Sequence, residues 1–109
     1  MIFGGLNSVW LVVMFDLPTE TKQQRRRYAL FRKFLLDDGF MMMQFSIYGR
    51  HCASDENADV HEKRVVLRLP EKGNVRILRV TEKQYARMKT FYGKKPAQTE
   101  EPPQQLSFF

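Results

Sequence analysis

The chain has 109 residues, a length that fits one small domain. Its 18 lysines and arginines against 12 acidic residues give a net charge of +6, which favours a polyanionic partner such as nucleic acid. The single cysteine excludes an internal disulfide. The sequence shows no membrane-spanning run, signal peptide or lipidation pattern, so we expect a cytoplasmic protein with no membrane partner.

The first predicted element is a strand over residues 8–15. This stretch is apolar almost throughout and rich in β-branched and aromatic residues, which is typical of a buried strand. It is followed at once by a carboxylate, Asp16, and then by Pro18. Asp16 is therefore a candidate for a structural or a chemical role at the end of the strand.

The next segment is the clearest predicted helix. Thr21 and Gln24 match a capping box at its start, and Gly39 supplies a C-terminal stop. One face of this helix carries its large apolar residues, Tyr28, Phe31, Phe34 and Leu35. Another side carries five basic residues, Lys22, Arg25, Arg26, Arg32 and Lys33.

The remaining elements are, in chain order, an extended segment with a bend (40–50), a helix (54–70), a strand (73–81), a short helix opened by a second capping box (82–88) and a last strand piece (89–93). The helix over 54–70 rests on the N-cap chemistry of Ser54, although "VVLRL" within it would also fit a strand. Residues 94–104 contain no large apolar side chain and are predicted to be a mobile tail.

This order of elements predicts an α+β fold, a ferredoxin-like βαββαβ sandwich over residues 1–93 followed by the tail over 94–109. Two helices of this size cover only one face of the sheet, yet the first strand is apolar on both faces. A second copy of the chain is the simplest cover for the other face. We therefore expect a homodimer whose sheets pack across a twofold axis.

With these elements placed, the chain resembles CRISPR-associated protein two, the small subunit of the spacer-acquisition complex, in the form found in type II systems. The matching stretches are "VVMFDLP", "RRRYALFRKFLLDDGF", "MMMQFSIYGR", "GNVRILRVTEKQYARM" and "FYG". The family often has tyrosine where this chain has Phe15, a difference from which we expect little consequence.

The resemblance implies a homodimer held between two dimers of the CRISPR integrase, a heterohexamer that binds double-stranded DNA and inserts a fragment into the CRISPR array. It also implies an alternative role as a magnesium-dependent endonuclease acting on single-stranded RNA or double-stranded DNA. The family aspartate corresponds to Asp16, which would bind Mg²⁺. We favour the scaffold as the main role, for which catalysis is not required.

Asp16 has an ordinary interpretation as well, since an acid before a proline often ends a strand or caps a helix. A magnesium site takes one or two carboxylates plus water, so a single aspartate makes a poor site. A twofold axis that brings two copies of Asp16 together makes a better one, and the metal would then polarise a phosphate. No histidine or glutamate near it in sequence suggests a general base, so we expect slow chemistry at most.

The five basic helix residues, Lys22, Arg25, Arg26, Arg32 and Lys33, are the candidate phosphate contacts. A solvated helix face is the usual explanation for such a run. Here no acid lies between residues 21 and 36 to neutralise it. Such contacts would fix position and affinity on DNA without reading sequence, and four further arginines, Arg64, Arg68, Arg76 and Arg79, would extend them.

Several other side chains receive ordinary interpretations. His51 and Cys52 do not have a zinc-ligand spacing, and His61 is predicted to be exposed. The three aromatics Phe15, Phe45 and Tyr48 could stack on bases, but core packing is the favoured interpretation because no RNA-binding motif is present.

The last five residues, "QLSFF", place apolar side chains at the end of a polar tether. They resemble the pentapeptide that docks bacterial replication proteins on the sliding clamp, with Phe108 where that motif prefers leucine. The candidate docking residues are Gln105, Leu106, Phe108 and Phe109. An edge strand of the fold or a contact with the integrase are the alternatives.

Overall fold

A computed structural model describes residues 7–103 of the chain. Its elements are β1 (Val9–Asp16), α1 (Lys22–Asp37), β2 (Met41–Gln44), β3 (Ile47–Cys52), α2 (Asp55–Leu67), β4 (Asn74–Thr81), α3 (Glu82–Ala86), β5 (Thr90–Tyr92) and β6 (Lys95–Ala97). The order confirms the predicted α+β fold, with the extended segment divided into β2 and β3 and the ambiguous segment after Ser54 folded as a helix.

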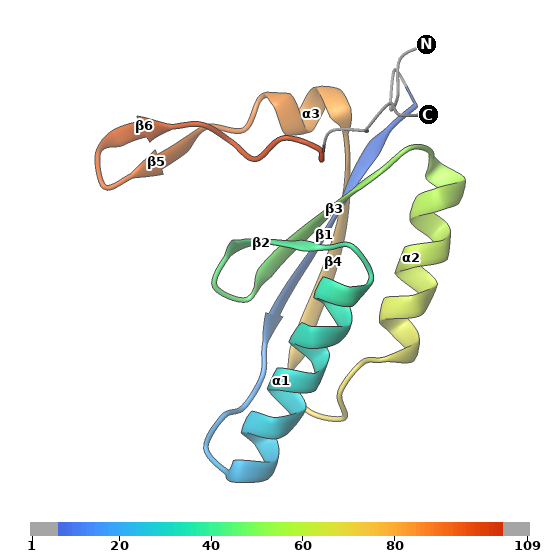
Figure 1. Cartoon of the computed structure of the whole chain (residues 1–109), viewed down its shortest axis with the longest axis vertical. Helices are drawn as coiled ribbons and strands as arrows, with labels where there is room; N and C mark the ends of the chain where they lie inside the picture. The colour runs from blue at the N-terminus through green and yellow to red at the C-terminus, as the bar shows by residue number, and fades with distance from the viewer. Residues whose placement is uncertain (1–6, 104–109) are drawn as a thin grey trace.

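The first four strands form one antiparallel sheet in the order β2-β3-β1-β4. The long helices α1 and α2 lie side by side on one face of it (Figure 1). Central strand β1 pairs with β3 and β4 along its length, so that Val13 lies between Tyr48 and Ile77. This arrangement is ferredoxin-like and agrees with the prediction.

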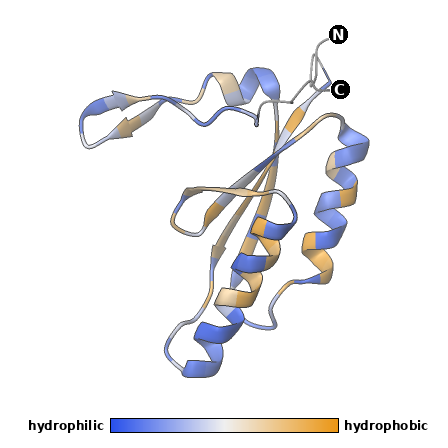
Figure 2. Ribbon diagram, viewed as in Figure 1, coloured by the Kyte–Doolittle hydropathy of each residue, from blue (hydrophilic) through white to orange (hydrophobic). Residues whose placement is uncertain are grey.

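The covered face of the sheet holds the core. Alternate residues of β1 point to this face, and they are Val9, Leu11, Val13 and Phe15. Leu35 of α1 and Val65 of α2 pack against them and are fully buried. Both helices carry apolar and polar residues along their length (Figure 2), and burial of the apolar residues that pack against the sheet accounts for this layer.

Both predicted capping boxes are present. The Thr21 side chain accepts from the amide of Gln24, and the Gln24 side chain accepts from the amide of Thr21. The pair Thr81 and Gln84 repeats the same two bonds at the start of α3. Each box satisfies amide groups that a helix cannot satisfy internally, which is why the two helices begin at these residues.

The opposite face of the sheet is only partly covered within one chain. At one end Tyr85 of α3 stacks on Trp10, with ring centroids 4.0 Å apart, and Trp10 is fully buried. Further along this face Leu78 is 49% exposed and does not belong to the buried core. We call this surface the open face; it comprises the even-numbered residues of β1 and β4 and their neighbours on β3.

The end of the described chain forms a β5–β6 hairpin that projects away from the sheet (Figure 1). The predicted boundary after residue 93 falls in the turn of this hairpin. The residues beyond it lack large apolar side chains, but their main chain pairs with β5. The chain then returns to the body, where the Tyr85 hydroxyl donates to the carbonyl of Glu100. Burial raises the pKa of Tyr85 to about 12, which keeps this donor protonated.

Candidate nucleic-acid interface

Asp16 is the last residue of β1 and is exposed. It pairs in register with Asn74, the first residue of β4, and both side chains belong to the open face. With Phe45, Ile47 and Arg76 they line a hollow of about 290 Å³ at the end of the sheet. The sequence thus correctly placed Asp16 at a strand end, and the structure adds its position on the rim of the open face.

The turn between β2 and β3 forms another side of this hollow. Ser46 has a φ of 64°, a left-handed conformation that costs a non-glycine residue of order 1 kcal/mol. Two bonds hold the turn: the amide of Phe15 donates to the carbonyl of Ser46, and the hydroxyls of Ser46 and Tyr28 lie 2.8 Å apart. The turn leaves the neighbouring Phe45 80% exposed, although the sequence favoured core packing for that ring.

The side chains around Asp16 offer few ligands for Mg²⁺ within one chain. Among residues 7–103 no group of three or more histidine, cysteine or acidic side chains could hold a metal ion. Among the described residues that line the hollow, Asp16 is the one carboxylate, and Asn74 and Ser46 are the other side chains with an oxygen. One carboxylate with water is the minimum that magnesium uses, and a second carboxylate from a partner copy would improve the fit.

The five predicted phosphate contacts divide into two groups. All five are exposed on α1, away from its buried side. Arg25 donates to the carbonyls of Thr19 and Glu20, and Lys33 forms an ion pair of 2.6 Å with Asp37. The other three are Lys22, Arg26 and Arg32. Their side chains make no hydrogen bond or ion pair within the described part of the chain.

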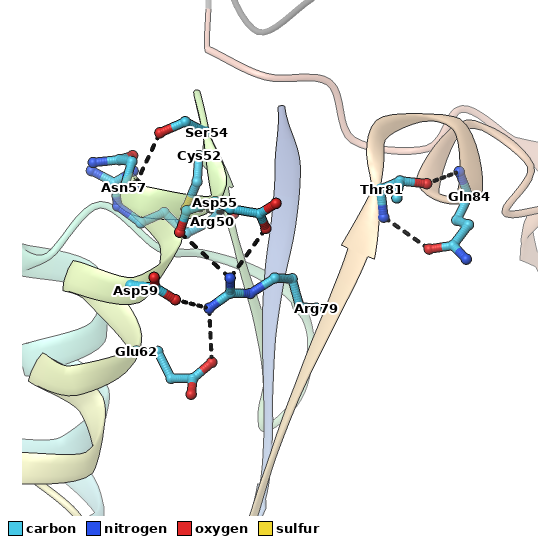
Figure 3. Close-up of polar contacts among 10 residues, drawn as sticks. All are labelled: Arg50, Cys52, Ser54, Asp55, Asn57, Asp59, Glu62, Arg79, Thr81 and Gln84. Atoms are coloured by element: carbon cyan, nitrogen blue, oxygen red, sulfur yellow. Dashed lines mark hydrogen bonds and ion pairs between the residues drawn. The ribbon is translucent and has the colours of Figure 1, made fainter. Parts of the chain in front are cut away.

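Three of the four arginines expected to extend this surface are already engaged. Arg79 points to the covered face and contacts three acids of α2, Asp55, Asp59 and Glu62, at 2.9–3.1 Å (Figure 3). Although burial opposes it, these carboxylates raise the pKa of Arg79. Arg64 forms an ion pair of 2.8 Å with Asp38, and Arg68 lies over the ring of Phe34. Only Arg76 lies on the open face.

The two histidines also have structural partners. The prediction that His61 is exposed was wrong: its side chain is buried and its Nδ1 donates to Asp38 across 2.7 Å. Burial alone would raise the pKa of Asp38, but the hydrogen bonds from His61 and Arg64 outweigh it, so this pKa is lowered. His51 bonds Glu82 at 2.9 Å, and burial raises the pKa of the adjacent Cys52 thiol.

Glu82 joins three groups of the open face. It accepts from Ser8 at 2.6 Å and lies 3.5 Å from the indole nitrogen of Trp10, besides its bond to His51. Burial opposes ionisation, yet these hydrogen bonds lower the pKa of Glu82. This cluster could not be predicted from the sequence, because Glu82 lies 74 residues from Ser8 in the chain.

The candidate docking residues of the tail, Gln105, Leu106, Phe108 and Phe109, lie outside the described residues. Over residues 7–103, no helix has the length and apolar character needed to cross a membrane.

Comparison with known proteins identifies the relatives of this chain. The family model described as CRISPR associated protein Cas2 matches residues 9–88. A protein of Flavobacterium psychrophilum is 56% identical over 102 residues, covering 94% of this chain and 89% of its own. One of Parvibaculum lavamentivorans is 52% identical, covering 93% of this chain and all of its own. Both relatives are named CRISPR-associated endoribonuclease Cas2.

Proposed function

The chain belongs to the CRISPR-associated Cas2 family, and from that premise we propose that it is a homodimeric DNA-binding subunit of the complex that integrates spacers into the CRISPR array. The observation that carries this proposal is the basic side of α1. Lys22, Arg26 and Arg32 are exposed there without an ion-pair partner in the described chain. Long cationic side chains in this state gain most from a polyanion.

The open face supports the homodimer. It presents Leu78, half exposed, beside the buried Val12 of the central strand. An apolar sheet face left to solvent is uncommon in a stable protein, and a twofold-related copy presents the same apolar surface in return. A dimer formed in this way carries two basic α1 helices, one on each side of the assembly.

Contacts from these helices are suited to the phosphates of duplex DNA. Lysine and arginine bind phosphate through charge and hydrogen bonds, and such contacts set affinity and register while leaving the base sequence unread. A DNA fragment of any sequence can then be held, which is what a spacer-integration complex requires. The CRISPR integrase, as two dimers flanking this one, supplies the chemistry of insertion.

Duplex binding by full-length variants tests the proposal. Arg26→Glu should weaken binding to every duplex by a similar factor, at least about tenfold at low salt, because a contact is replaced by a repulsion. Lys63→Glu, an equal change of charge at an exposed residue of α2, is the matched control and should have a much smaller effect. Equal losses in both variants, or a loss confined to particular sequences, would contradict the proposal.

A second candidate function is that of a magnesium-dependent endonuclease, and the name endoribonuclease carried by both relatives favours a nuclease. The relevant observation here is the place of Asp16, exposed at the rim of the face that we assign to the dimer. Two copies of Asp16 near the twofold axis would hold Mg²⁺, which when bound supplies Lewis-acid chemistry toward a phosphate of single-stranded RNA or double-stranded DNA. Asn74 and Arg76 would position that phosphate.

Asp16→Asn separates the two candidates. The substitution keeps the size of the side chain and removes the charge that a metal requires. We expect the Asp16→Asn variant to retain spacer acquisition and to lose any nuclease activity. The wild type should lose the same nuclease activity when EDTA is added. Cleavage that survives EDTA would remove Asp16 from the site, and loss of acquisition would show that the chemistry is needed for the main role.

A further inference from the structure

We propose that Phe45 and Arg76 form a nucleotide subsite beside Asp16, which binds one nucleotide of a single strand by stacking on the Phe45 ring and pairing a phosphate with Arg76. The inference rests on the proposed nucleic-acid function and names the class of ligand that this end of the sheet accepts. It is independent of the α1 surface, which carries the duplex contacts.

The first observation is the exposure of Phe45. At 80% it is the most exposed phenylalanine of the described chain, whereas Phe15 and Phe31 are buried. A ring that is mostly in contact with water contributes little to folding, but it offers a flat apolar surface on which any base can stack. Its only aromatic neighbour in the described chain is Tyr28, at a centroid distance of 6.0 Å.

The second observation is that the turn carrying Phe45 is held firmly. Ser46 adopts a left-handed conformation, and its carbonyl and hydroxyl are bound by Phe15 of β1 and Tyr28 of α1. Strained backbone of this kind persists where the surroundings fix it, and it is common at ligand sites. The turn therefore fixes the direction in which the ring projects, which lowers the cost of ordering it on binding.

The third observation is the charge beside the ring. Phe45, Asp16 and Arg76 line the same hollow, and the Arg76 guanidinium has no hydrogen-bond or ion-pair partner among residues 7–103. Arg76 is the neighbour of Met14 in the sheet, one step along the open face from Asp16. A stacking ring and an unpaired arginine within one hollow are the two elements by which proteins hold single strands.

Duplex DNA does not fit this arrangement, because its bases are stacked on one another and their faces are not available to Phe45. A single-stranded RNA or DNA segment, or a frayed duplex end, presents unstacked bases. The subsite therefore selects single-stranded over double-stranded nucleic acid next to the residue assigned to phosphodiester chemistry.

The test uses full-length variants and a fluorescein-labelled single-stranded uridine 12-mer, with a duplex of the same length for comparison. Phe45→Ala should weaken binding to the single strand by at least about fivefold and leave duplex binding unchanged. Phe91→Ala, which removes an exposed ring of β5 that does not line the hollow, is the matched control and should leave both unchanged. Arg76→Ala should lower the salt dependence of single-strand binding, by about 0.7 in the slope of log K against log salt.

Phe45→Trp gives a second readout that does not depend on affinity. The native Trp10 is fully buried, so quenching of fluorescence by the 12-mer would report on the introduced indole. We expect quenching together with binding at least as tight as in the wild type. Three results would overturn the subsite. They are absence of quenching, equal losses of single-strand binding in Phe45→Ala and Phe91→Ala, and a Phe45→Ala variant whose only defect is loss of the dimer. If Arg26→Glu does not weaken duplex binding, the proposed duplex-binding function is overturned. The single-strand measurements on the Phe45 variants would still test the subsite.

Discussion

The two faces of the sheet use the same strand differently. On the covered face, Val13 and its neighbours pack against the α1 and α2 helices and are removed from water within one chain. On the open face, Trp10 is covered by α3, but the surface around Leu78 stays exposed. The covered face therefore stabilises the fold of a single chain, and we propose that the open face serves association with a second copy.

The polar groups follow the same division. Those near the covered face are paired within the chain, as in the contacts of Arg79 with α2 and of Asp38 with His61 and Arg64. At the Asp16 end of the open face, the charged side chains have no such partners in the described residues. Unpaired charge beside exposed apolar surface is what a binding site requires, and it adds little to the stability of one chain.

The largest expected effect comes from the covered face. Leu35→Ala should lower the free energy of unfolding by about 2–5 kcal/mol, because it leaves a cavity where a fully buried side chain was. Its neighbour Leu36 is 39% exposed on the same helix, so Leu36→Ala is the matched control and should cost less than about 1 kcal/mol. Urea unfolding monitored by circular dichroism measures both, and equal costs would break the assignment of the core to this face.

The next effect concerns Asp38 and acid. Its pKa is lowered in the folded protein, so the stabilisation it provides is complete above its unfolded pKa of about 3.9 and is lost as the pH falls through the lower folded value. Asp38→Asn should therefore cost about 1–3 kcal/mol of unfolding free energy at pH 7 and progressively less in acid.

Asp37→Asn is the control for this comparison. Asp37 is exposed, and among residues 7–103 it pairs only with the exposed Lys33, so its loss should change stability by less than about 1 kcal/mol at any pH. Urea unfolding at pH 7 and near pH 3 is the measurement. A cost of Asp38→Asn that does not shrink in acid would show that the bonds to His61 and Arg64 do not favour the ionised carboxylate.

A smaller effect distinguishes unpaired from paired arginines. Arg26→Ala should reduce the slope of log K for duplex binding against log salt by about 0.9, the share of one phosphate contact. Arg64→Ala removes an arginine held by Asp38, so it should lower stability and leave the slope unchanged. Fluorescence anisotropy over a range of salt concentrations measures the slopes. Equal slopes for Arg26→Ala and the wild type would remove Arg26 from the interface.

The smallest effect on stability is expected from the tail. Deletion of residues 104–109 keeps β6 and the bond from Tyr85 to Glu100, so folding, dimerisation and DNA binding should not change. Cutting after Gly93 would remove both contacts. We expect the deletion to abolish binding to the integrase or to the sliding clamp. Capture of each candidate partner by a Lys94–Phe109 peptide is the measurement.

The control for that capture is the peptide with Leu106→Ala and Phe109→Ala. Each buried anchor contributes about 1.5–3 kcal/mol before ordering costs, enough for a weak contact that these changes abolish. If neither partner is retained and the deletion dissociates the dimer, the tail is part of the fold instead.

Much of the fold could be predicted because its signals are local. The capping boxes at Thr21 and Thr81 and the apolar side of α1 depend on residues only a few positions apart in the chain, and the structure confirms each of them. The burial of His61 could not be predicted, because it depends on Asp38, 23 residues away in the chain. The exposure of Phe45 likewise depends on the turn at Ser46 and on contacts from two other elements.

We propose that a second copy of this chain covers the part of the open face around Leu78 and leaves the hollow at its Asp16 end open to solvent. Light scattering of the full-length protein at micromolar concentration tests it, beside Leu78→Asp on the open face and Leu30→Asp on an exposed part of α1. We expect about 26 kDa, twice the 13.0 kDa of one chain, for the wild type and Leu30→Asp, and a folded species near 13.0 kDa for Leu78→Asp. A monomeric wild type, or a Leu78→Asp variant that remains a dimer, would contradict it.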